Sequence, residues 1–456
     1  MKFSLKPYIS LVIVLLLCVL GFSGCKKEGA MLRQENDGNF KYGIYEDRVE
    51  IIGYVGQGGN VSLPTTFDEQ SVTVVSDRAF MGNTNITSLS IPEGYVKLGN
   101  EAFSNCIRLG EVQFPVSLTE IGKDAFSFCT ALESVTLPSN LKALPDNMFY
   151  RCRELKFVKL PDKLETIGKS AFFGCKVLTD VELNNSLKVI DDEAFSGCEK
   201  LTYIKLHDSV EKIGNKAYEA CRGITSFQAG KGLKTIGENA FGLCHSLSTI
   251  TLNDGLETIK KGAFSETVIT EVSVPQSVKT LEGCFIGCEM LTTASLPQQL
   301  TAIPDEIFSG CKKLVAVEIP ITVKAIGQKA FYDCESLLEI KLPEGLETVE
   351  AYAFSKCIRL NKLNFPSSLK TLEEGALSNC ISLSSIKLND GIETLGKGAF
   401  ASCLKLQNIT LPSSVQNFGE GLFQSCSYLK TVTVCKEKGT VNTSSWGTGF
   451  KIRWKP

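Results

Sequence analysis

The chain has 456 residues, with 48 Lys plus Arg, 50 Asp plus Glu and a formal charge of −2. This balance leaves no basic excess to displace the counterions of a phosphate backbone, so nucleic acid is not expected as a partner. With only 2 His residues, a His-rich metal site or a Ser-His-Asp relay is disfavoured, and we expect no metal and no cofactor. At about 150 residues per domain the length alone would suggest about three domains.

The segment 1–24 is predicted to be an export signal. Lys2 and Lys6 form a short basic segment, and the apolar run 9–20 that follows is broken only by Ser10. This run is short for a membrane-spanning helix and has the length of a secretory signal. Every interpretation of the segment, an uncleaved anchor included, places residues 26–456 outside the cytoplasm.

The end of the apolar run resembles a bacterial lipoprotein signal. Residues 23–25, Ser-Gly-Cys, match its lipobox, whereas Phe22 stands where Leu is more usual. The resemblance implies a signal peptide over 1–24 and lipidation of Cys25, whose several acyl chains would anchor the protein stably to the bacterial outer membrane. Ordinary secretory cleavage is the alternative. Residues 25–38 then form a flexible tether, because they have little apolar content and no periodicity.

An internal repeat determines the predicted fold. Aliphatic or aromatic residues recur with a period of 23, with two shorter rows of 22, at Val75, Leu98, Ile121, Leu144, Ile167, Ile190, Ile213, Ile236, Ile259, Leu281, Ile303, Ile326, Val349, Leu372, Leu395 and Phe418. These sixteen rows cover 75–434, and each approximates I-G-x-x-A-F-x-x-C-x-x-L-x-x-I-x-L-P-x-x-L-x-x. A fixed period of this length indicates a solenoid, which overrules the estimate of three domains.

One row shows how each coil is predicted to form. Residues 133–137 alternate polar and apolar side chains, as a short half-buried strand does, and Pro138 ends the strand because it has no N–H to donate. Gly122 is expected to permit a tight turn, and residues 125–129 are expected to form a helical turn. Strands of successive rows would pair in parallel at about 4.8 Å, which gives the sixteen rows a length of roughly 75 Å.

Two residue types occupy single positions of the row. Fourteen of the 26 Phe form a Phe column, interrupted only by Tyr218 and Leu377, and we interpret this column as a stacked core rather than as a cofactor or sugar platform. Fourteen of the 18 Cys form a Cys column. Side chains stacked at the strand spacing are too far apart for relaxed disulfides, so buried free thiols are predicted. Cys284 is interpreted as a small core residue, and Cys435 as the thiol with the greatest exposure.

The row pattern resembles that of the BspA-like leucine-rich repeat family. It is almost intact in 132–152 and 247–264 and covers close to four-fifths of the chain. The resemblance implies a β-rich, right-handed β/α superhelix of leucine-rich repeats, with about sixteen rows of length 22–23. A β-rich N-terminal cap over 39–74 and a C-terminal cap over 435–456 are expected, because the end coils would otherwise expose their core. Rows 259–302 are each shorter by one position, so a local irregularity in curvature is expected there.

The residues that flank the central apolar residue of each strand are predicted to point outward. This face is polar, rich in Ser and Thr, and has no His, Cys or recurring carboxylate pair, so no catalytic residue is predicted. Two aromatic residues, Phe157 and Tyr203, lie on it two rows apart with charged residues around them. Because aromatic anchors with polar surroundings concentrate binding energy, we predict a ligand patch formed by Phe157, Lys159, Asp180, Glu182, Tyr203 and Lys205. The alternative is that β propensity alone accounts for the two aromatic residues.

The family resemblance implies a non-catalytic protein of the cell surface, since BspA-like proteins are linked to attachment to host matrix proteins and to other bacteria. A long rigid array offers a large binding face but does not identify a ligand. The alternative function is a surface lipoprotein that captures glycans or peptides as nutrients beside an outer-membrane transporter. The few exposed aromatic residues argue against sugars in particular. Protein partners and a lipid-anchored, surface location are therefore expected.

Overall fold

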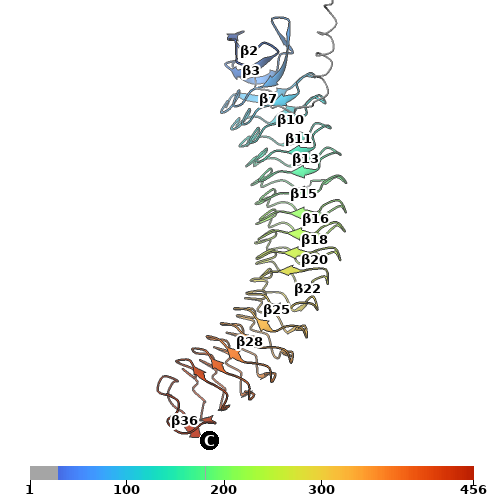
Figure 1. Cartoon of the computed structure of the whole chain (residues 1–456). Helices are drawn as coiled ribbons and strands as arrows, with labels where there is room; N and C mark the ends of the chain where they lie inside the picture. Colours follow the sequence, from blue (N-terminus) through green and yellow to red (C-terminus); the bar gives the residue numbers. More distant parts are fainter. Residues whose placement is uncertain (1–28, 180, 456) are drawn as a thin grey trace, which may run out of the picture.

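The computed structural model describes residues 29–179 and 181–455. The predicted signal peptide, the predicted lipidation site Cys25 and Asp180 of the predicted patch lie outside these residues. The described chain is a β-solenoid of about 18 turns, with repeats about 23 residues apart (Figure 1). The predicted solenoid is confirmed.

Each coil contributes up to two short strands, which pair in parallel with the same strands of the neighbouring coils. The face strands carry the predicted outward residues: β4 (Gly59–Ser62), β7 (Ile86–Ser90), β9 (Glu111–Gln113), β11 (Ser134–Thr136), β13 (Phe157–Lys159), β16 (Tyr203–Lys205), β18 (Ser226–Gln228), β20 (Thr249–Thr251), β22 (Glu271–Ser273), β24 (Thr293–Ser295), β26 (Ala316–Val317), β29 (Lys362–Asn364), β31 (Ser385–Lys387), β33 (Asn408–Leu411), β35 (Thr431–Val434) and β36 (Lys451–Trp454).

Most of the second strands end on the repeating apolar residue of each row. They are β3 (Val49–Tyr54), β6 (Gln70–Val75), β8 (Lys97–Leu98), β10 (Glu120–Ile121), β12 (Ala143–Leu144), β14 (Thr166–Ile167), β15 (Val189–Ile190), β17 (Lys212–Ile213), β19 (Thr235–Ile236), β21 (Thr258–Ile259), β23 (Thr280–Leu281), β25 (Ala302–Ile303), β27 (Ala325–Ile326), β28 (Thr348–Val349), β30 (Thr371–Leu372), β32 (Thr394–Leu395) and β34 (Asn417–Phe418).

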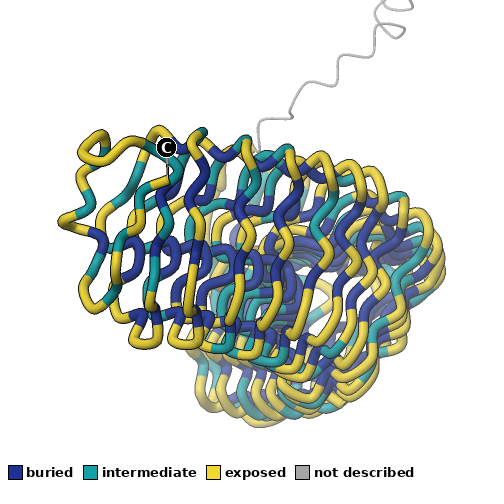
Figure 2. The backbone as a smooth tube through the Cα atoms, turned by 90° about the horizontal axis from the view of Figure 1, so that it is seen from below, coloured by how far each residue is buried: buried dark blue, intermediate teal, exposed yellow. Residues whose placement is uncertain are grey.

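The Phe column forms the centre of the core. Rings of successive rows stack with centroid separations from 4.7 Å, between Phe80 and Phe103, to 6.1 Å, between Phe126 and Phe149. Tyr218 continues the stack within the column. Figure 2 shows buried backbone lining the interior of the coils and exposed backbone at their outer corners. The interpretation of the column as a stacked core is confirmed.

The Cys column consists of free, buried thiols, as predicted. Each thiol donates a hydrogen bond to the backbone carbonyl oxygen of a Phe-column residue in the preceding row; the Cys129 Sγ lies 3.3 Å from the Phe103 oxygen. The same oxygen also accepts the Cys106 amide at 3.3 Å, so it bonds both to its own row and to the next. Cys284 is buried, and Cys435 is the described cysteine that is only partly buried.

The segment expected to be a helical turn is instead a pair of hydrogen-bonded turns. The Ser127 amide bonds the Asp124 carbonyl at 3.1 Å, and the Cys129 amide bonds the Phe126 carbonyl at 3.3 Å. Asp124 and Phe128 both have positive φ, of 57° and 59°, which breaks a right-handed helix after each turn. The part of the chain that the structure describes therefore contains no helix.

Glycine at the second position of the row has a different role from the one expected. Gly168 does not have a positive φ, but a Cβ atom there would lie 2.5 Å from the carbonyl oxygen of Leu144 in the preceding coil. The amide of Gly168 bonds that same oxygen at 3.0 Å. Glycine is therefore required for close approach of two coils rather than for a turn.

Both ends of the solenoid are covered. At the amino-terminal end, β2 (Phe40–Ile44) pairs antiparallel with β1 (Arg33–Asn36) on one side and with β3 on the other. In the next coil, β5 (Thr66–Phe67) pairs antiparallel with β6. Tyr42 of β2 is 1% exposed and stacks on Phe67 at 3.9 Å. At the other end β36 pairs parallel with β35, and buried Trp446 packs 5.1 Å from Phe418. Because β3 and β36 pair in parallel with the neighbouring coils, the coils that contain them extend the array beyond the sixteen predicted rows.

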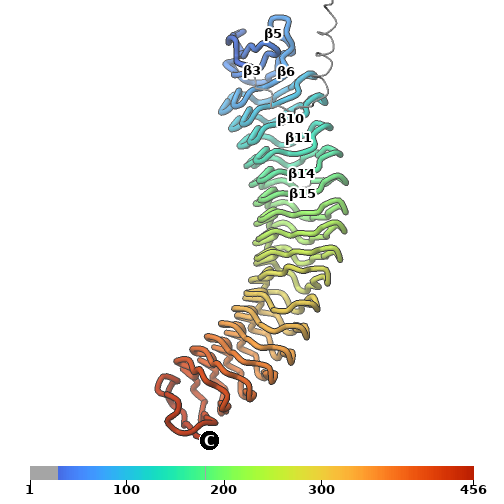
Figure 3. Tube along the Cα trace, viewed as in Figure 1, coloured from blue at the N-terminus to red at the C-terminus, as the bar shows by residue number. Residues whose placement is uncertain are grey.

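The shorter rows coincide with a break in the second-strand ladder. Parallel pairing is continuous from β12 to β23 and resumes from β25 to β34, but β23 and β25 do not pair. A similar break separates β10 from β12 nearer the amino-terminal end. Figures 1 and 3 show the axis of the solenoid bending in the region of the shorter rows. The irregularity in curvature predicted for rows 259–302 is observed.

Candidate functional site

The face strands present two outward side chains per row, as predicted. In β13 the flanking residues Phe157 and Lys159 are exposed, whereas Val158 between them is 5% exposed and packs into the core. The pattern repeats in most face strands because side chains alternate across a strand. The solenoid thereby displays a long row of exposed side chains on a backbone fixed by the stacked core.

The structure brings part of the predicted patch together. Phe157, Lys159 and Glu182 line one hollow of about 510 Å³, here called the β13 hollow, and His207 also lines it. Phe157 is 58% exposed, so its ring is available to a ligand. Asp180, between these rows, lies outside the described residues.

The remaining members of the predicted patch lie beside this hollow. Tyr203 and Lys205 line a separate cavity of about 30 Å³, to which Leu183 of the β13 hollow also contributes. The Tyr203 hydroxyl lies 3.4 Å from the Gln228 Oε1 in the following row, so this side chain leans away from Phe157. Phe157 and Tyr203 thus lie two rows apart on one face and do not line the same hollow.

A second hollow on the same face was not predicted. This β26 hollow, of about 1430 Å³, is lined by residues of β26 and β29 and by the segment 338–344 between them. Its exposed apolar side chains are Val315, Ile321 and Leu338. The sequence signal was available, because the row position of Val315 and Leu338 elsewhere holds polar residues such as Lys156, Thr202 and Ser248.

Both hollows coincide with an interruption of the face strands. Residues 181–183, between β13 and β16, form no strand, and neither do residues 339–342, between β26 and β29. Every other described row from β4 to β36 has a face strand. The face thus lacks a strand at two places, and large apolar side chains are exposed beside both of them.

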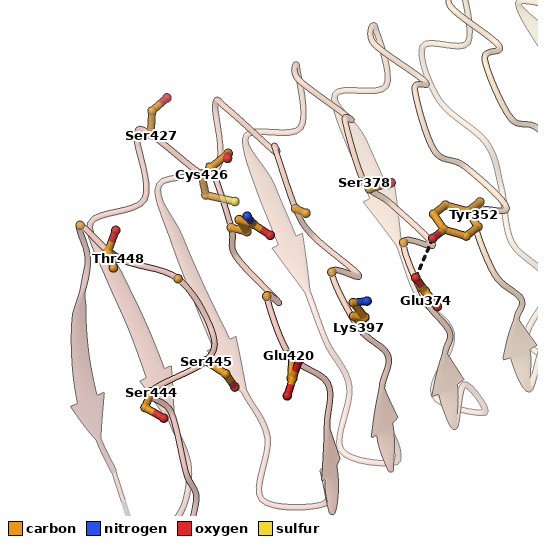
Figure 4. Close-up of a pocket in the computed structure, with 18 residues that line it drawn as sticks. Tyr352, Glu374, Ser378, Lys397, Glu420, Cys426, Ser427, Ser444, Ser445 and Thr448 are labelled. Atoms are coloured by element: carbon orange, nitrogen blue, oxygen red, sulfur yellow. Dashed lines mark hydrogen bonds between the residues drawn. The ribbon is translucent and has the colours of Figure 1, made fainter.

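A polar groove lies on another side of the solenoid, near its carboxyl end (Figure 4). Its volume is about 800 Å³, and Gly375, Gly398 and Gly421 take the row position that Tyr352 holds one row earlier. The Tyr352 hydroxyl donates a 2.7 Å hydrogen bond to the Glu374 carboxylate, which raises the pKa of Tyr352. Absent side chains in three successive rows thus open a groove with one aromatic residue at its end.

The thiols offer little reactive chemistry. Burial raises the pKa of the Cys106 thiol and of the Cys288 thiol to about 12, so neither forms a thiolate nucleophile near neutral pH. Across residues 29–179 and 181–455, no group of three or more His, Cys, Asp or Glu side chains is placed to hold a metal ion. The same residues form no helix that could span a membrane.

Charged side chains pair between rows on the solenoid surface. Lys123 lies 2.6 Å from Asp146, and Lys156 lies 3.0 Å from Glu133, in each case one row apart. Exposed pairs of this kind each contribute about 0–1 kcal/mol. These pairs add little stability and form no binding site.

Repeats about 23 residues apart, with stacked aliphatic and aromatic columns and parallel face strands, define a leucine-rich-repeat solenoid. The chain matches the family described as BspA type Leucine rich repeat region (6 copies) over 73–183, 169–288, 211–338, 281–380 and 324–448. These segments cover most of the chain, which therefore belongs to the BspA-type leucine-rich repeat family. The family and the fold predicted from the sequence are confirmed.

The chain is similar to several solved structures, one of which shares its fold with a TM-score above 0.5. A leucine-rich repeat protein from Bacteroides ovatus is 24% identical over 92% of this chain and 98% of its own, with a TM-score of 0.65. A leucine rich cell surface protein from Faecalibacterium prausnitzii is 24% identical over 91% and 98%, with a TM-score of 0.40. The pneumococcal vaccine antigen PcpA is 20% identical over 93% and 88%, with a TM-score of 0.31. No curated protein matches the chain.

Proposed function

We propose that this protein is a non-catalytic binding protein of the bacterial cell surface, anchored by lipid on Cys25, that attaches to host matrix proteins or to other cells. The observation that carries the proposal is the face of the solenoid, where exposed side chains recur in row after row on a rigid backbone. Repeat proteins use extended surfaces of this kind to bind macromolecules. Membership of the leucine-rich repeat family supports a binding role rather than a catalytic one.

Two experiments on cells test the location. Fatty-acid labelling of the expressed chain should be lost in Cys25→Ser and retained in Cys18→Ser, a cysteine within the predicted signal. Protease treatment of intact cells should degrade the wild-type chain, because a surface adhesin is accessible from outside. Survival of the chain under conditions that leave the cells intact would place it inside the envelope and overturn the adhesion proposal.

Binding is tested with a soluble form that begins at residue 26. This protein should bind immobilised matrix proteins or whole bacterial cells in a surface-plasmon or pull-down assay. If the predicted patch carries the binding, Phe157→Ser combined with Tyr203→Ser should abolish it, because both large anchors are removed. The matched control is Gln113→Ser, an exposed face position in another row. Unchanged affinity of the double variant would show that the patch is not the binding site.

Capture of glycans is the second candidate function, and the C-terminal groove favours it. Gly375, Gly398 and Gly421 let a polymer approach the backbone closely, while Tyr352 offers an aromatic ring and Lys397 a hydrogen-bond donor. A glycan array probed with the soluble protein tests this function. A hit that is lost in Tyr352→Ala would support it, and binding to matrix proteins alone would exclude it.

A further inference from the structure

The β26 hollow combines three features found together at no other described place on the face. The first is an exposed apolar cluster formed by Val315, Leu338 and Ile321, which are 42%, 40% and 84% exposed. Exposed apolar groups clustered beside polar ones mark interaction sites on soluble proteins. Val315 and Leu338 stand at the same position of successive rows, so their side chains lie side by side along the solenoid.

The second feature is the open strand ladder. Within the described chain, the amides of Glu339, Ile340 and Lys341 form no backbone hydrogen bond to β26 or to β29, and this row has no strand. Lys362 follows Glu339 by one full row, the offset that pairs Lys156 with Glu133, yet Lys362 and Glu339 form no ion pair. This row therefore lacks the face-strand pairing that joins β24 to β26 and β29 to β31 on either side of it.

The third feature is a group of basic side chains without acidic partners. Arg359, Lys362 and Lys405 line the hollow in the rows that follow the apolar cluster, and none of them forms an ion pair with a described residue. The acidic side chains of the hollow belong to the two preceding rows; they are Glu318, Glu339 and Glu344. Lys341 also lines the hollow, in the row of Glu339. The end with the apolar residues therefore has three glutamates and one lysine, and the other end has three basic side chains.

We propose that the β26 hollow binds an extended segment of a protein partner in which two large apolar side chains are followed by carboxylates. The lining residues come from five successive rows, which span roughly 20 Å at the spacing of parallel strands. An extended segment of about six residues covers that distance. The apolar side chains would lie against Val315, Leu338 and Ile321, and the carboxylates would pair with Arg359 and its basic neighbours.

This inference rests on the proposed binding function and names the chemistry of one partner surface. Nucleic acid does not suit the hollow, because its three glutamates border the apolar end. Two other occupants of the hollow, a second copy of the chain and a lipid surface, are distinguished from a peptide segment by the experiment below.

The test uses the soluble protein and fluorescein-labelled peptides measured by fluorescence anisotropy. The probe has two Leu followed by two Glu in a Gly/Ser background, and the comparison peptides carry Lys in place of Glu or Ser in place of Leu. We expect binding of the first peptide, weakened by added salt, and at least tenfold weaker binding of the other two. The variants Arg359→Glu with Lys362→Glu, and Val315→Ser with Ile321→Ser, should each weaken binding at least tenfold.

Matched controls occupy the same row positions elsewhere. Arg108 and Val116 are exposed and lie in the row that begins at Leu98. Arg108→Glu is the control for Arg359→Glu, and Val116→Ser is the control for Ile321→Ser. Neither control should alter peptide binding. Equal binding of the lysine peptide, or affinity unaffected by the hollow variants, would overturn the proposal. Concentration-dependent dimerisation that the same variants abolish, or binding to anionic vesicles, would also overturn it by identifying another occupant.

The same variants in the matrix-protein assay separate this inference from the proposed function. If the wild-type chain binds matrix protein but no acidic peptide, the inference fails and the proposed function stands. If the chain binds the peptide but neither matrix protein nor cells, the proposed function fails and the inference stands. Loss of both activities in the Arg359→Glu, Lys362→Glu variant would show that the hollow serves the proposed function.

Discussion

Replacing Tyr218 with Phe should stabilise the protein. Tyr218 takes a place in the Phe column, where its ring lies 5.2 Å from both Phe195 and Phe241 with interplanar angles of 3° and 8°. Its hydroxyl is buried and has no hydrogen-bond partner among the described residues. Phe at this position keeps the ring stack and removes the polar atom.

The magnitude follows from the cost of the unpaired hydroxyl. A buried polar group without a partner costs about 1–3 kcal/mol, and Tyr218→Phe should recover most of this in the free energy of unfolding. Tyr218 also lines the cavity of about 30 Å³ beside Tyr203, which is large enough for one water molecule. A water bonded to the hydroxyl there would reduce the gain in the free energy of unfolding to near zero. The substitution therefore distinguishes an unpaired hydroxyl from one that is bonded to water.

Urea denaturation followed by circular dichroism measures the effect. The matched control is Phe172→Tyr, which adds a hydroxyl at the same row position and should lower stability by about 1–3 kcal/mol. The midpoint and slope of each transition are compared, because repeat arrays need not unfold in two states. An unchanged or lower midpoint for Tyr218→Phe would refute the claim that the hydroxyl is unsatisfied.

The pH dependence of the same variant has a defined sign. Burial raises the pKa of Tyr218 well above the usual 10.0, so the folded chain keeps the hydroxyl neutral where the unfolded chain ionises it. The stability that depends on the neutral hydroxyl is fully present below pH 10 and is lost as the pH rises further. The advantage of Phe over Tyr at position 218 should therefore grow above pH 10.

Three further substitutions or treatments test the core. In urea denaturation, Gly168→Ala should destabilise the chain by about 1–3 kcal/mol, because the new Cβ would clash with the Leu144 carbonyl. The control Gly345→Ala should be nearly neutral, because its Cβ would make only an ordinary van der Waals contact. Phe126→Ala should cost about 3–5 kcal/mol in the same assay, and a loss below about 1 kcal/mol would contradict the stacked core. A thiol reagent at pH 8 should modify Cys435 in the folded protein and reach Cys column thiols only after unfolding; rapid modification of the buried thiols would contradict their raised pKa.

The sequence predicted the core well because a fixed period determines which residues stack. Once Phe126 and Cys129 are known to recur once in each row, their neighbours in the adjacent coils follow directly. The local backbone was less predictable. Asp124 and Phe128 adopt positive φ although neither is glycine, and no residue type marks these positions across the rows. The requirement for Gly168 depends on contact between coils, which a single row cannot reveal.

The candidate site was predicted only where an aromatic residue marked it. Phe157 and Tyr203 directed attention to one hollow and its neighbouring cavity, whose role in binding stays a prediction. The β26 hollow was not predicted because Val315 and Leu338 stand one residue before the two row positions that are predicted to point outward. The interruption over 339–342 could not be predicted, since this row has the full length and the usual apolar pattern.

Binding specificity in such a solenoid has to come from rows that depart from the average. The buried positions are nearly identical from coil to coil, so the core cannot distinguish one part of the face from another. Substitutions at exposed positions change stability by only about 0.5 kcal/mol, so the face can vary without loss of the fold. Exposed apolar anchors and interrupted face strands occur together at the β13 hollow and at the β26 hollow. We expect the less regular backbone at these places to adapt to a ligand, while the stacked columns beneath it hold the array in place.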